Sequence, residues 1–275
     1  MSTANRHTRL AVCVAIMGVW AWGSSAGAAS DTILSSFASP TSFPYGLTYS
    51  SGTLYLSDAV SMTIYRLHPD TGSVMSSFVP SPKPAGSFMV GLASTPGYLW
   101  ATTISPSRLF QIGATSGSVV NSYTLSSITD ADGLAAEGNY VYIANSSSTA
   151  FFVYKFHPSS GSIVDSWPGG KYPSGLNVIT HVPTGQKVVM NVGNVDGWVP
   201  FNGLNGQRYS GQAFKIDAPC GEGNYAGDLA TRDNTHIYYA ANYLKYIYYL
   251  SINWGKNEVP AVAPTSFGKI KALYR

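Results

Sequence analysis

The chain has 275 residues, of which 45% are hydrophobic, 13% are aromatic and only 11% are charged, with a formal net charge of +3. Helices with solvent-exposed faces need many Glu, Lys, Arg and Gln residues, so this composition argues against a helical protein. Glycine and tyrosine are abundant, with 28 and 19 residues, as expected for short strands that are joined by tight turns.

Residues 1–29 are predicted to be a secretory signal peptide. Arg6 and Arg9 form a basic start, residues 10–22 form an apolar core, and residues 26–28 (Ala-Gly-Ala) match a small-residue cleavage pattern. The apolar core is too short for a comfortable membrane span. We therefore expect a secreted or periplasmic protein with no membrane span after cleavage, and an uncleaved membrane anchor is the alternative.

The mature chain is predicted to be nearly neutral. Cleavage removes Arg6 and Arg9 and leaves 14 basic and 13 acidic residues, with Cys220 as the remaining cysteine. A nearly neutral chain has no basic field for nucleic acid, so no nucleic-acid partner is expected. One cysteine cannot form a disulfide within the chain, so stability must come from sheet packing.

A repeat of roughly 44 residues follows the predicted signal peptide. Its units begin at Gly46, Gly91, Gly133, Gly175 and Gly227, at spacings of 45, 42, 42 and 52 residues. Each unit contains four short strand-like runs, which we name A to D from the axis outward. Four strands in about 40–50 residues is the period of a propeller blade.

The first unit shows the pattern most fully. Strand A follows the Gly-Leu pair at 46–47, strand B is the buried-type run 54–56, and strand C alternates over 64–67. A Pro-Asp-Thr-Gly turn at 69–72 joins strand C to strand D, which ends in a Ser-Phe pair. The second and third units repeat this order.

The fourth unit is looser, and the fifth has no strand D of its own. Strands B, C and D of the fourth unit are predicted near residues 187–191, 198–202 and 207–214, and a long excursion then extends to residue 226. The fifth unit has strands A to C at 229–231, 236–241 and 246–252. Residues 33–40 resemble 74–81, so the N-terminal segment is predicted to supply the missing strand.

The sequence therefore predicts an all-β, five-bladed β-propeller over residues 30–255. Its blades are four-stranded and antiparallel, and the ring closes by pairing of the N-terminal strand with the last blade, because open sheet edges invite aggregation. Six blades are the alternative. Residues 256–275 fit no blade and are predicted to be a C-terminal tail.

The cadence of these motifs resembles that of NHL-like, gluconolactonase-like and virginiamycin-B-lyase-like bacterial β-propellers. The resemblance lies in Gly-Leu, then Leu-Tyr-Leu-Ser-Asp, then Ile-Tyr-Arg-Leu-His-Pro-Asp-Thr-Gly, and it covers about residues 31–255. It implies the fold. It leaves the function open, because one propeller scaffold hosts hydrolases, lyases, cyclases and binding modules.

A ligand site is expected on the face where the D-to-A and B-to-C connections gather around the axial channel. We call this face the mouth. Aromatic side chains there can stack on sugars or hold a peptide. The predicted ligand-binding residues are Tyr45, Asp58, Phe88, Asp132, Asn145, Trp198, Glu222, Tyr225, Asp228 and Asn242.

Aspartate and asparagine at strand ends can bind a hard cation such as Ca²⁺. The gluconolactonase-like relatives hold such an ion with Glu, Asn and Asp, which makes Asn145 and Asp228 the metal candidates, although the family's Glu has no counterpart in the first blade's inner strand. The alternative is that these side chains only satisfy turn amides. Asp130 and Asp132 likewise read either as an acid–base couple or as ordinary turn sequence.

The leading functional hypothesis is an exported, non-catalytic propeller that binds a glycan, a peptide or a cell-surface partner on the blade-four side of the mouth. The alternative is a metal-dependent enzyme, lactonase-like or lyase-like, centred on Asn145, Asp228 and Glu222. Lyase chemistry would need a histidine at the mouth, and none is predicted there. The mature histidines are His68, His157, His181 and His236.

Overall fold

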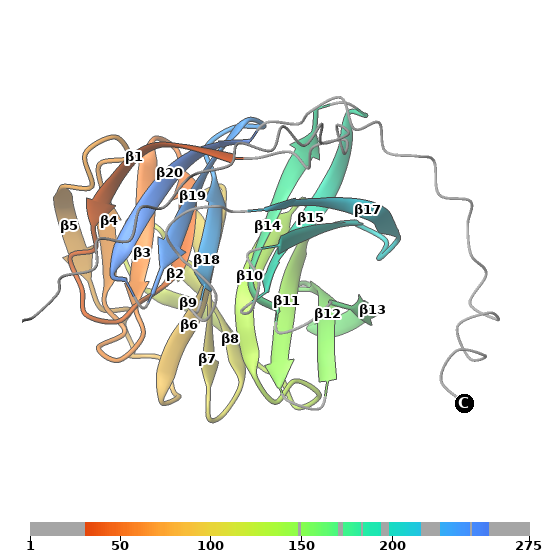
Figure 1. Ribbon diagram of the computed structural model, residues 1–275. Helices are drawn as coiled ribbons and strands as arrows, with labels where there is room; N and C mark the ends of the chain where they lie inside the picture. The colour runs from red at the N-terminus through yellow and green to blue at the C-terminus, as the bar shows by residue number, and fades with distance from the viewer. Residues whose placement is uncertain are drawn as a thin grey trace, which may run out of the picture.

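The computed structural model describes residues 31–147, 150–169, 173–182, 184–193, 198–215, 226–242 and 244–252. These residues form twenty β-strands and no helix, in five four-stranded antiparallel sheets (Figure 1). The predicted five-bladed β-propeller is confirmed. The predicted signal peptide and C-terminal tail lie outside the described residues.

Each of the first four blades is a run of consecutive strands, ordered from the axis outward. Blade one contains β2 (Pro44–Ser50), β3 (Thr53–Asp58), β4 (Ile64–Leu67) and β5 (Val74–Phe78). Blade two contains β6 (Phe88–Thr95), β7 (Tyr98–Ile104), β8 (Arg108–Gly113) and β9 (Val119–Thr124). Blade three contains β10 (Ala131–Glu137), β11 (Tyr140–Ser147), β12 (Ala150–His157) and β13 (Ser162–Pro168). Blade four contains β14 (Pro173–His181), β15 (Gln186–Gly193), β16 (Trp198–Gly203) and β17 (Arg208–Lys215).

Blade five combines the two ends of the described chain. It contains β18 (Ala226–Thr231), β19 (His236–Ala241), β20 (Tyr246–Ile252) and the N-terminal strand β1 (Asp31–Ala38). Strand β1 pairs with β20 from Thr32 opposite Ser251 to Ala38 opposite Tyr246, with one irregularity, and the two strands lie side by side in Figure 1. The predicted closure of the ring by the N-terminal strand is therefore confirmed.

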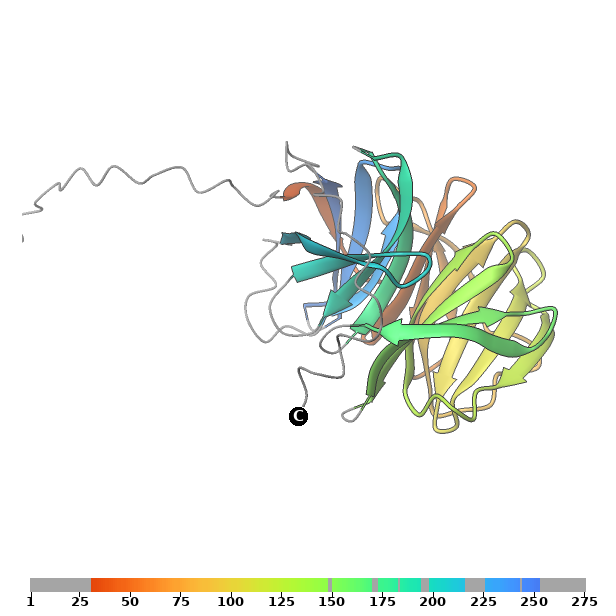
Figure 2. The same ribbon diagram turned by 90° about the vertical axis from the view of Figure 1, so that its right-hand side faces the viewer.

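The five inner strands surround the axis. Strands β2, β6, β10, β14 and β18 contact one another in this cyclic order, and β18 returns to β2. Successive blades follow one another around the ring from orange through yellow and green to blue (Figure 2). Apolar clusters lie between blades, as where Leu47 and Leu54 of blade one pack with Tyr238 and Ile247 of blade five. Each blade thus buries its faces against its neighbours.

A repeated contact links the outer strands of blades five, one and three to the next blade. The aromatic residue near the end of the outer strand packs against the glycine of the following blade's C-to-D turn. These turn glycines have φ angles between 69° and 77°, which disfavour other residues, and a Cβ there would meet the aromatic ring. The contacting pairs are Phe37 with Gly72, Phe78 with Gly117, and Trp167 with Gly206.

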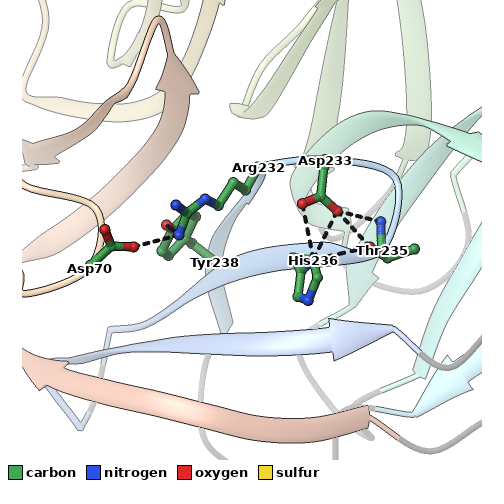
Figure 3. Close-up of polar contacts among 6 residues, drawn as sticks. All are labelled: Asp70, Arg232, Asp233, Thr235, His236 and Tyr238. Atoms are coloured by element: carbon green, nitrogen blue, oxygen red, sulfur yellow. Dashed lines mark hydrogen bonds and ion pairs between the residues drawn. The ribbon is translucent and has the colours of Figure 1, made fainter.

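A polar cluster joins blades five and one on the face opposite the mouth (Figure 3). Arg232 Nη1 donates to Asp70 Oδ1 at 2.5 Å and to the Tyr238 hydroxyl at 3.3 Å. The neighbouring His236 Nδ1 lies 2.9 Å from Asp233 Oδ1. Because the Arg232–Asp70 pair is partly exposed and bridges two blades, we assign it to the closing seam, and the His236–Asp233 contact lies beside it within blade five.

The predicted start of strand A was wrong. Strand A does not follow the Gly-Leu pair but contains it: in blade one, Pro44 pairs with Asp58 and Leu47 pairs with Leu56, with a bulge between. The bulge lets the ladder continue past the glycine toward the mouth. Tyr45, Asp132 and Asp228, which were expected in or beside D-to-A connections, therefore lie on the inner strands β2, β10 and β18.

Candidate functional site

One position of the inner strand is equivalent in all five blades and faces the axis. It is the residue before the leucine that pairs with the second strand. This residue lies in the bulge in blades one, two, three and five, whereas in blade four Gly175 itself pairs with Val192 directly after the bulge. We call these five residues the axial ring. The axial ring consists of Gly46, Gly91, Gly133, Gly175 and Asp228.

The four glycines are required by close approach of the inner strands. A Cβ at Gly133 would lie 2.6 Å from Gly175 Cα, and a Cβ at Gly175 would lie 2.7 Å from the Gly227 carbonyl oxygen. Both distances are shorter than real Cβ contacts. The four blades with glycine therefore leave room at the axis for one side chain, and Asp228 of blade five supplies it.

The Asp228 carboxyl group is fully buried and binds backbone N–H groups from several blades. Its Oδ2 accepts hydrogen bonds from Leu47 N at 3.2 Å and Leu92 N at 3.4 Å. Its Oδ1 accepts from Leu176 N at 3.2 Å and from Leu229 N at 2.9 Å. Burial raises the pKa of Asp228, the backbone hydrogen bonds partly oppose the rise, and the nearby charge of Asp132 adds to it.

Both calcium candidates have oxygens that are engaged by backbone donors. Asn145 Oδ1 accepts from Asp130 N at 3.2 Å and from Ser147 N at 3.4 Å, and both Asp228 oxygens accept as described above. Converging N–H groups suit an anion and oppose a cation at the same place. Within the described ranges, no three His, Cys, Asp or Glu side chains are grouped so that they could hold a metal ion.

The residues one step nearer the mouth form a second ring, which includes Tyr45 and Asp132. The Tyr45 hydroxyl donates to Asp132 Oδ2 at 3.4 Å across the axis, although the two residues are 87 positions apart in the chain. Asp132 is 7% exposed, and its Oδ1 has no hydrogen-bond partner in the part of the chain that the structure describes. One buried carboxylate oxygen is therefore left without a partner among the described residues, and we call such an atom open.

Burial controls the acidity of this pair. It raises the pKa of Asp132 to about 7, while a hydrogen bond from Ser146 lowers it, the charge of Asp130 raises it and the Tyr45 hydroxyl lowers it. The charge of Asp132 and then burial raise the pKa of Tyr45 well above its ordinary value. Asp132 thus exchanges its proton near neutral pH, whereas Tyr45 stays protonated.

Asn242 adds a second buried acceptor at the mouth. It follows β19 in the position that Ser146 takes in blade three. Its Oδ1 has no partner among the described residues and occupies the space beside Gly227, where a side chain would collide with it. The structure therefore places two open acceptor oxygens, from Asp132 and Asn242, around the mouth.

Asp58 has a local structural role. Its Oδ1 accepts from Val60 N at 2.9 Å and from Ser61 N at 2.7 Å, and the Thr41 hydroxyl donates to its Oδ2. These bonds hold the B-to-C turn of blade one. This geometry agrees with the alternative in which strand-end carboxylates satisfy turn amides.

Exposed apolar side chains lie beside this turn. Phe43, Val60 and Phe88 are 56%, 46% and 43% exposed. Their segments are joined by backbone hydrogen bonds, because Ala59 N donates to the Phe43 carbonyl and Met89 N donates to the Ala59 carbonyl, both at 2.9 Å. We call Phe43, Val60 and Phe88 the apolar rim.

Some of the site residues were not found from the sequence, and others are not placed by the structure. Phe43, Val60 and Ser146 were missed, although large apolar residues in turns at the mouth were an available signal for the first two. Trp198 begins β16, but its side chain is not described. Glu222 and Tyr225 lie outside the described residues.

The comparisons with known proteins agree with the fold. No protein-family profile and no curated protein sequence matches the chain. Among solved structures, the chain is similar to glutaminyl cyclase of Myxococcus xanthus, with a TM-score of 0.62 and 13% identity over 82% of this chain and 98% of that one. It is also similar to PQQ-bound aldose sugar dehydrogenase of Streptomyces coelicolor, with a TM-score of 0.54 and 13% identity over 82% and 98%. A streptogramin B lyase has a TM-score of 0.51 and 13% identity over 81% and 98%.

These three neighbours are β-propeller proteins, and the chain itself is a five-bladed β-propeller. At 13% identity the likeness concerns the fold alone, because one fold carries many functions. None of the described residues belongs to a helix that is long and apolar enough to cross a membrane.

Proposed function

We propose that the chain is a ligand-binding β-propeller whose site is the mouth around Asp132, Tyr45 and Asn242. The observation that carries this proposal is the open Oδ1 of Asp132, which is buried and has no partner in the described chain. A buried acceptor that is left without a hydrogen bond costs about 1–3 kcal/mol. Native proteins therefore pair such groups with protein, water or ligand.

The open atoms define what the ligand must offer. Both Asp132 Oδ1 and Asn242 Oδ1 are acceptors, so the ligand has to donate hydrogen bonds from hydroxyl or amine groups. Hydroxyls are typical of a glycan, and amines are typical of a peptide. The exposed aromatic rings of the apolar rim are suited to stacking on either ligand.

A titration panel tests this proposal. We would follow ¹⁵N-labelled protein by NMR while adding monosaccharides, chitobiose and short peptides of mixed sequence. At least one ligand should shift the backbone amides of Tyr45, Asp132 and Asn242, and Asp132→Asn should weaken its affinity by about tenfold or more. Asp165→Asn, an exposed aspartate on β13, is the matched control and should bind like the wild type.

Binding that stays unchanged in Asp132→Asn, or shifts confined to other faces, would show that the mouth is not the ligand site. The predicted blade-four residues Trp198, Glu222 and Tyr225 can be tested in the same series by alanine substitution.

An acid–base enzyme is a second candidate, favoured by one observation. Because burial raises the pKa of Asp132 to about 7, this group can both take up and release a proton at neutral pH, as a general acid or base must. Turnover would be visible in the same panel as a substrate whose signals disappear with the wild type and persist with Asp132→Asn. Stoichiometric Ca²⁺ or Zn²⁺ in the purified protein would instead favour the metal-dependent alternative.

We also propose that the protein is exported by residues 1–29 to the periplasm or the cell exterior, where it meets its ligand. Support comes from the basic, apolar and small-residue segments of this sequence. Fractionation of expressing bacteria, followed by N-terminal sequencing, should give a mature protein that starts near residue 30. Recovery of the uncleaved chain from the cytosol would contradict the proposal.

A further inference from the structure

We infer that the ligand of the mouth carries a primary ammonium group attached to an apolar body. The inference rests on the proposed function, since it assigns a chemical class to the ligand of the same site. It is supported by the charges around the open oxygen, by the number of open oxygens and by the exposed apolar surface beside them.

The described residues of the mouth carry negative charge close together. Asp130 and Asp132 raise the pKa of Tyr45, and Asp132 also raises the pKa of Asp228. Within the described part of the chain, no cationic side chain contributes to the shifts of Asp132, Asp228 or Tyr45. A positive ligand would therefore relieve repulsion that the folded protein otherwise retains.

The number of open oxygens on Asp132 favours an ammonium group. Tyr45 already occupies Asp132 Oδ2, which leaves Oδ1 as the single open oxygen of this carboxyl group. A guanidinium group would use both oxygens of a carboxylate, whereas an ammonium group is a compact charge with three donors. It can donate to Asp132 Oδ1 and retain donors for Asn242 Oδ1 or water.

The apolar rim is connected along the backbone to the strands that carry these buried polar groups. Phe88 lies on β6 three residues before Gly91, and Gly91 packs directly against the Asp132 carbonyl. Phe43 lies two residues before Tyr45. An exposed apolar patch beside buried polar groups is typical of a binding site, so the ligand's apolar part is expected to rest on this rim.

Two small probes of nearly equal shape test the inference. Phenethylamine carries a primary ammonium on an aromatic body, and 2-phenylethanol replaces the ammonium with a neutral hydroxyl. In NMR titrations at pH 7.5, phenethylamine should shift the amides of residues 43–45, 88–91 and 130–132. It should bind at least about tenfold more tightly than the alcohol.

Two variants test separately how the ammonium group and the aromatic ring of the probe are bound. Asp132→Asn should remove the preference for the amine, whereas Phe88→Ala should weaken both probes. Val164→Ala, which shortens an exposed apolar residue on the outer strand β13, is the control for Phe88→Ala and should change neither affinity. Asp165→Asn should retain the amine preference.

The pH dependence provides a measurement that needs no variant. Because the pKa of Asp132 is about 7 and the amine stays protonated, phenethylamine affinity should rise about tenfold between pH 6 and pH 8. The groups that act on Asp132 are Tyr45, Asp130 and Ser146, and its charge also interacts with the buried Asp228. The affinity of the neutral alcohol should stay nearly constant over the same range.

The outcomes distinguish this inference from the proposed function. Equal affinity for both probes, or an amine affinity that is independent of pH and of Asp132, would overturn the ammonium assignment while mouth binding stands. Failure of both probes to bind at the mouth would also overturn it. The panel of sugars and peptides then decides separately whether the mouth is a ligand site.

Discussion

Asp132 and Asp228 are both buried aspartates of inner strands, but their surroundings give them different roles. Each of the two carboxylate oxygens of Asp228 accepts two hydrogen bonds from backbone N–H groups, so neither has acceptor capacity left for a ligand. Asp132 has one oxygen that accepts from Tyr45 and one that has no hydrogen-bond partner among the described residues. The first residue therefore stabilises the ring, and the second retains a carboxylate oxygen that a ligand's donor could use.

Asp132 should make the stability of the protein depend on pH. The pKa of Asp132 is about 7 in the folded state and about 3.9 when unfolded, so the folded state binds the proton more tightly between these values. The free energy of unfolding should therefore fall as pH rises from about 4 to about 7, by up to about 1.4 kcal/mol per pH unit from this group.

Urea unfolding of the wild type and of Asp132→Asn at several pH values measures this contribution. Since Asp228 is present in both proteins, the difference between the two curves reports Asp132 together with its coupling to Asp228. The wild type should lose stability relative to Asp132→Asn as pH rises, and Asp165→Asn should follow the wild type. Parallel curves for the wild type and Asp132→Asn would contradict the proposed burial of an ionisable carboxyl group.

At the level of strands, the sequence repeat predicts the blades because each of its motifs performs a separate structural task. The turn glycine permits a positive φ and leaves room for an aromatic ring, while the aromatic residue at the end of the outer strand fills that room in the next blade. The same Ser-aromatic pattern in β1 identified the N-terminal segment as the missing outer strand. Local patterns therefore sufficed for strand order and closure.

The contacts across the axis could not be predicted in this way. The Gly-Leu pair reads as the start of a strand, and only the ladder register shows the bulge inside it. Because the connection before blade five is long, the sequence alone placed the start of the fifth unit at Gly227. The strand pairing shows instead that Asp228 takes the position that glycine holds in the other four blades. Tyr45 and Asp132 meet from different blades, so no spacing in the sequence indicates their contact.

The packing of one blade's aromatic on the next blade's turn can be tested with two glycines. Gly117 and Gly97 have φ angles of 71° and 81°, but a Cβ at Gly117 would lie 2.7 Å from the Phe78 ring, and a Cβ at Gly97 meets nothing within 4 Å. Gly97→Ala should cost about 1–2 kcal/mol from the backbone conformation alone. Gly117→Ala should cost about 1–3 kcal/mol more, because the ring must move.

Chemical denaturation of both variants provides the comparison. Equal losses would mean that the ring of Phe78 does not hold the turn of blade two. A third variant, Phe78→Ala with Gly117→Ala, should lose less than the sum of the two single changes, since the collision is then removed.

At the scale of the whole molecule, Asp228 joins blade five to its neighbours, blades one and four, and also to blade two, which is not adjacent to it in the ring. From blade five its carboxyl group accepts hydrogen bonds from blades one, two and four. Blade five is also the blade that combines both ends of the described chain. The axial carboxyl group and the outer pairing of β1 with β20 therefore close the same blade from its two edges.

Replacement of Asp228 by glycine would complete a ring of five glycines and leave several buried N–H groups without an acceptor. Each such group costs about 1–3 kcal/mol, so Asp228→Gly should lose roughly 3–5 kcal/mol of unfolding free energy.

The space that Asp228→Gly vacates is bounded by backbone donors and matches a small carboxylate. Sodium formate should therefore raise the Tm of Asp228→Gly more than that of the wild type, because formate binds only the folded variant. Sodium chloride at the same ionic strength controls for general salt effects. A variant as stable as the wild type, or one that responds equally to both salts, would show that the axial N–H groups do not depend on a carboxylate and that the ring closes by apolar packing alone.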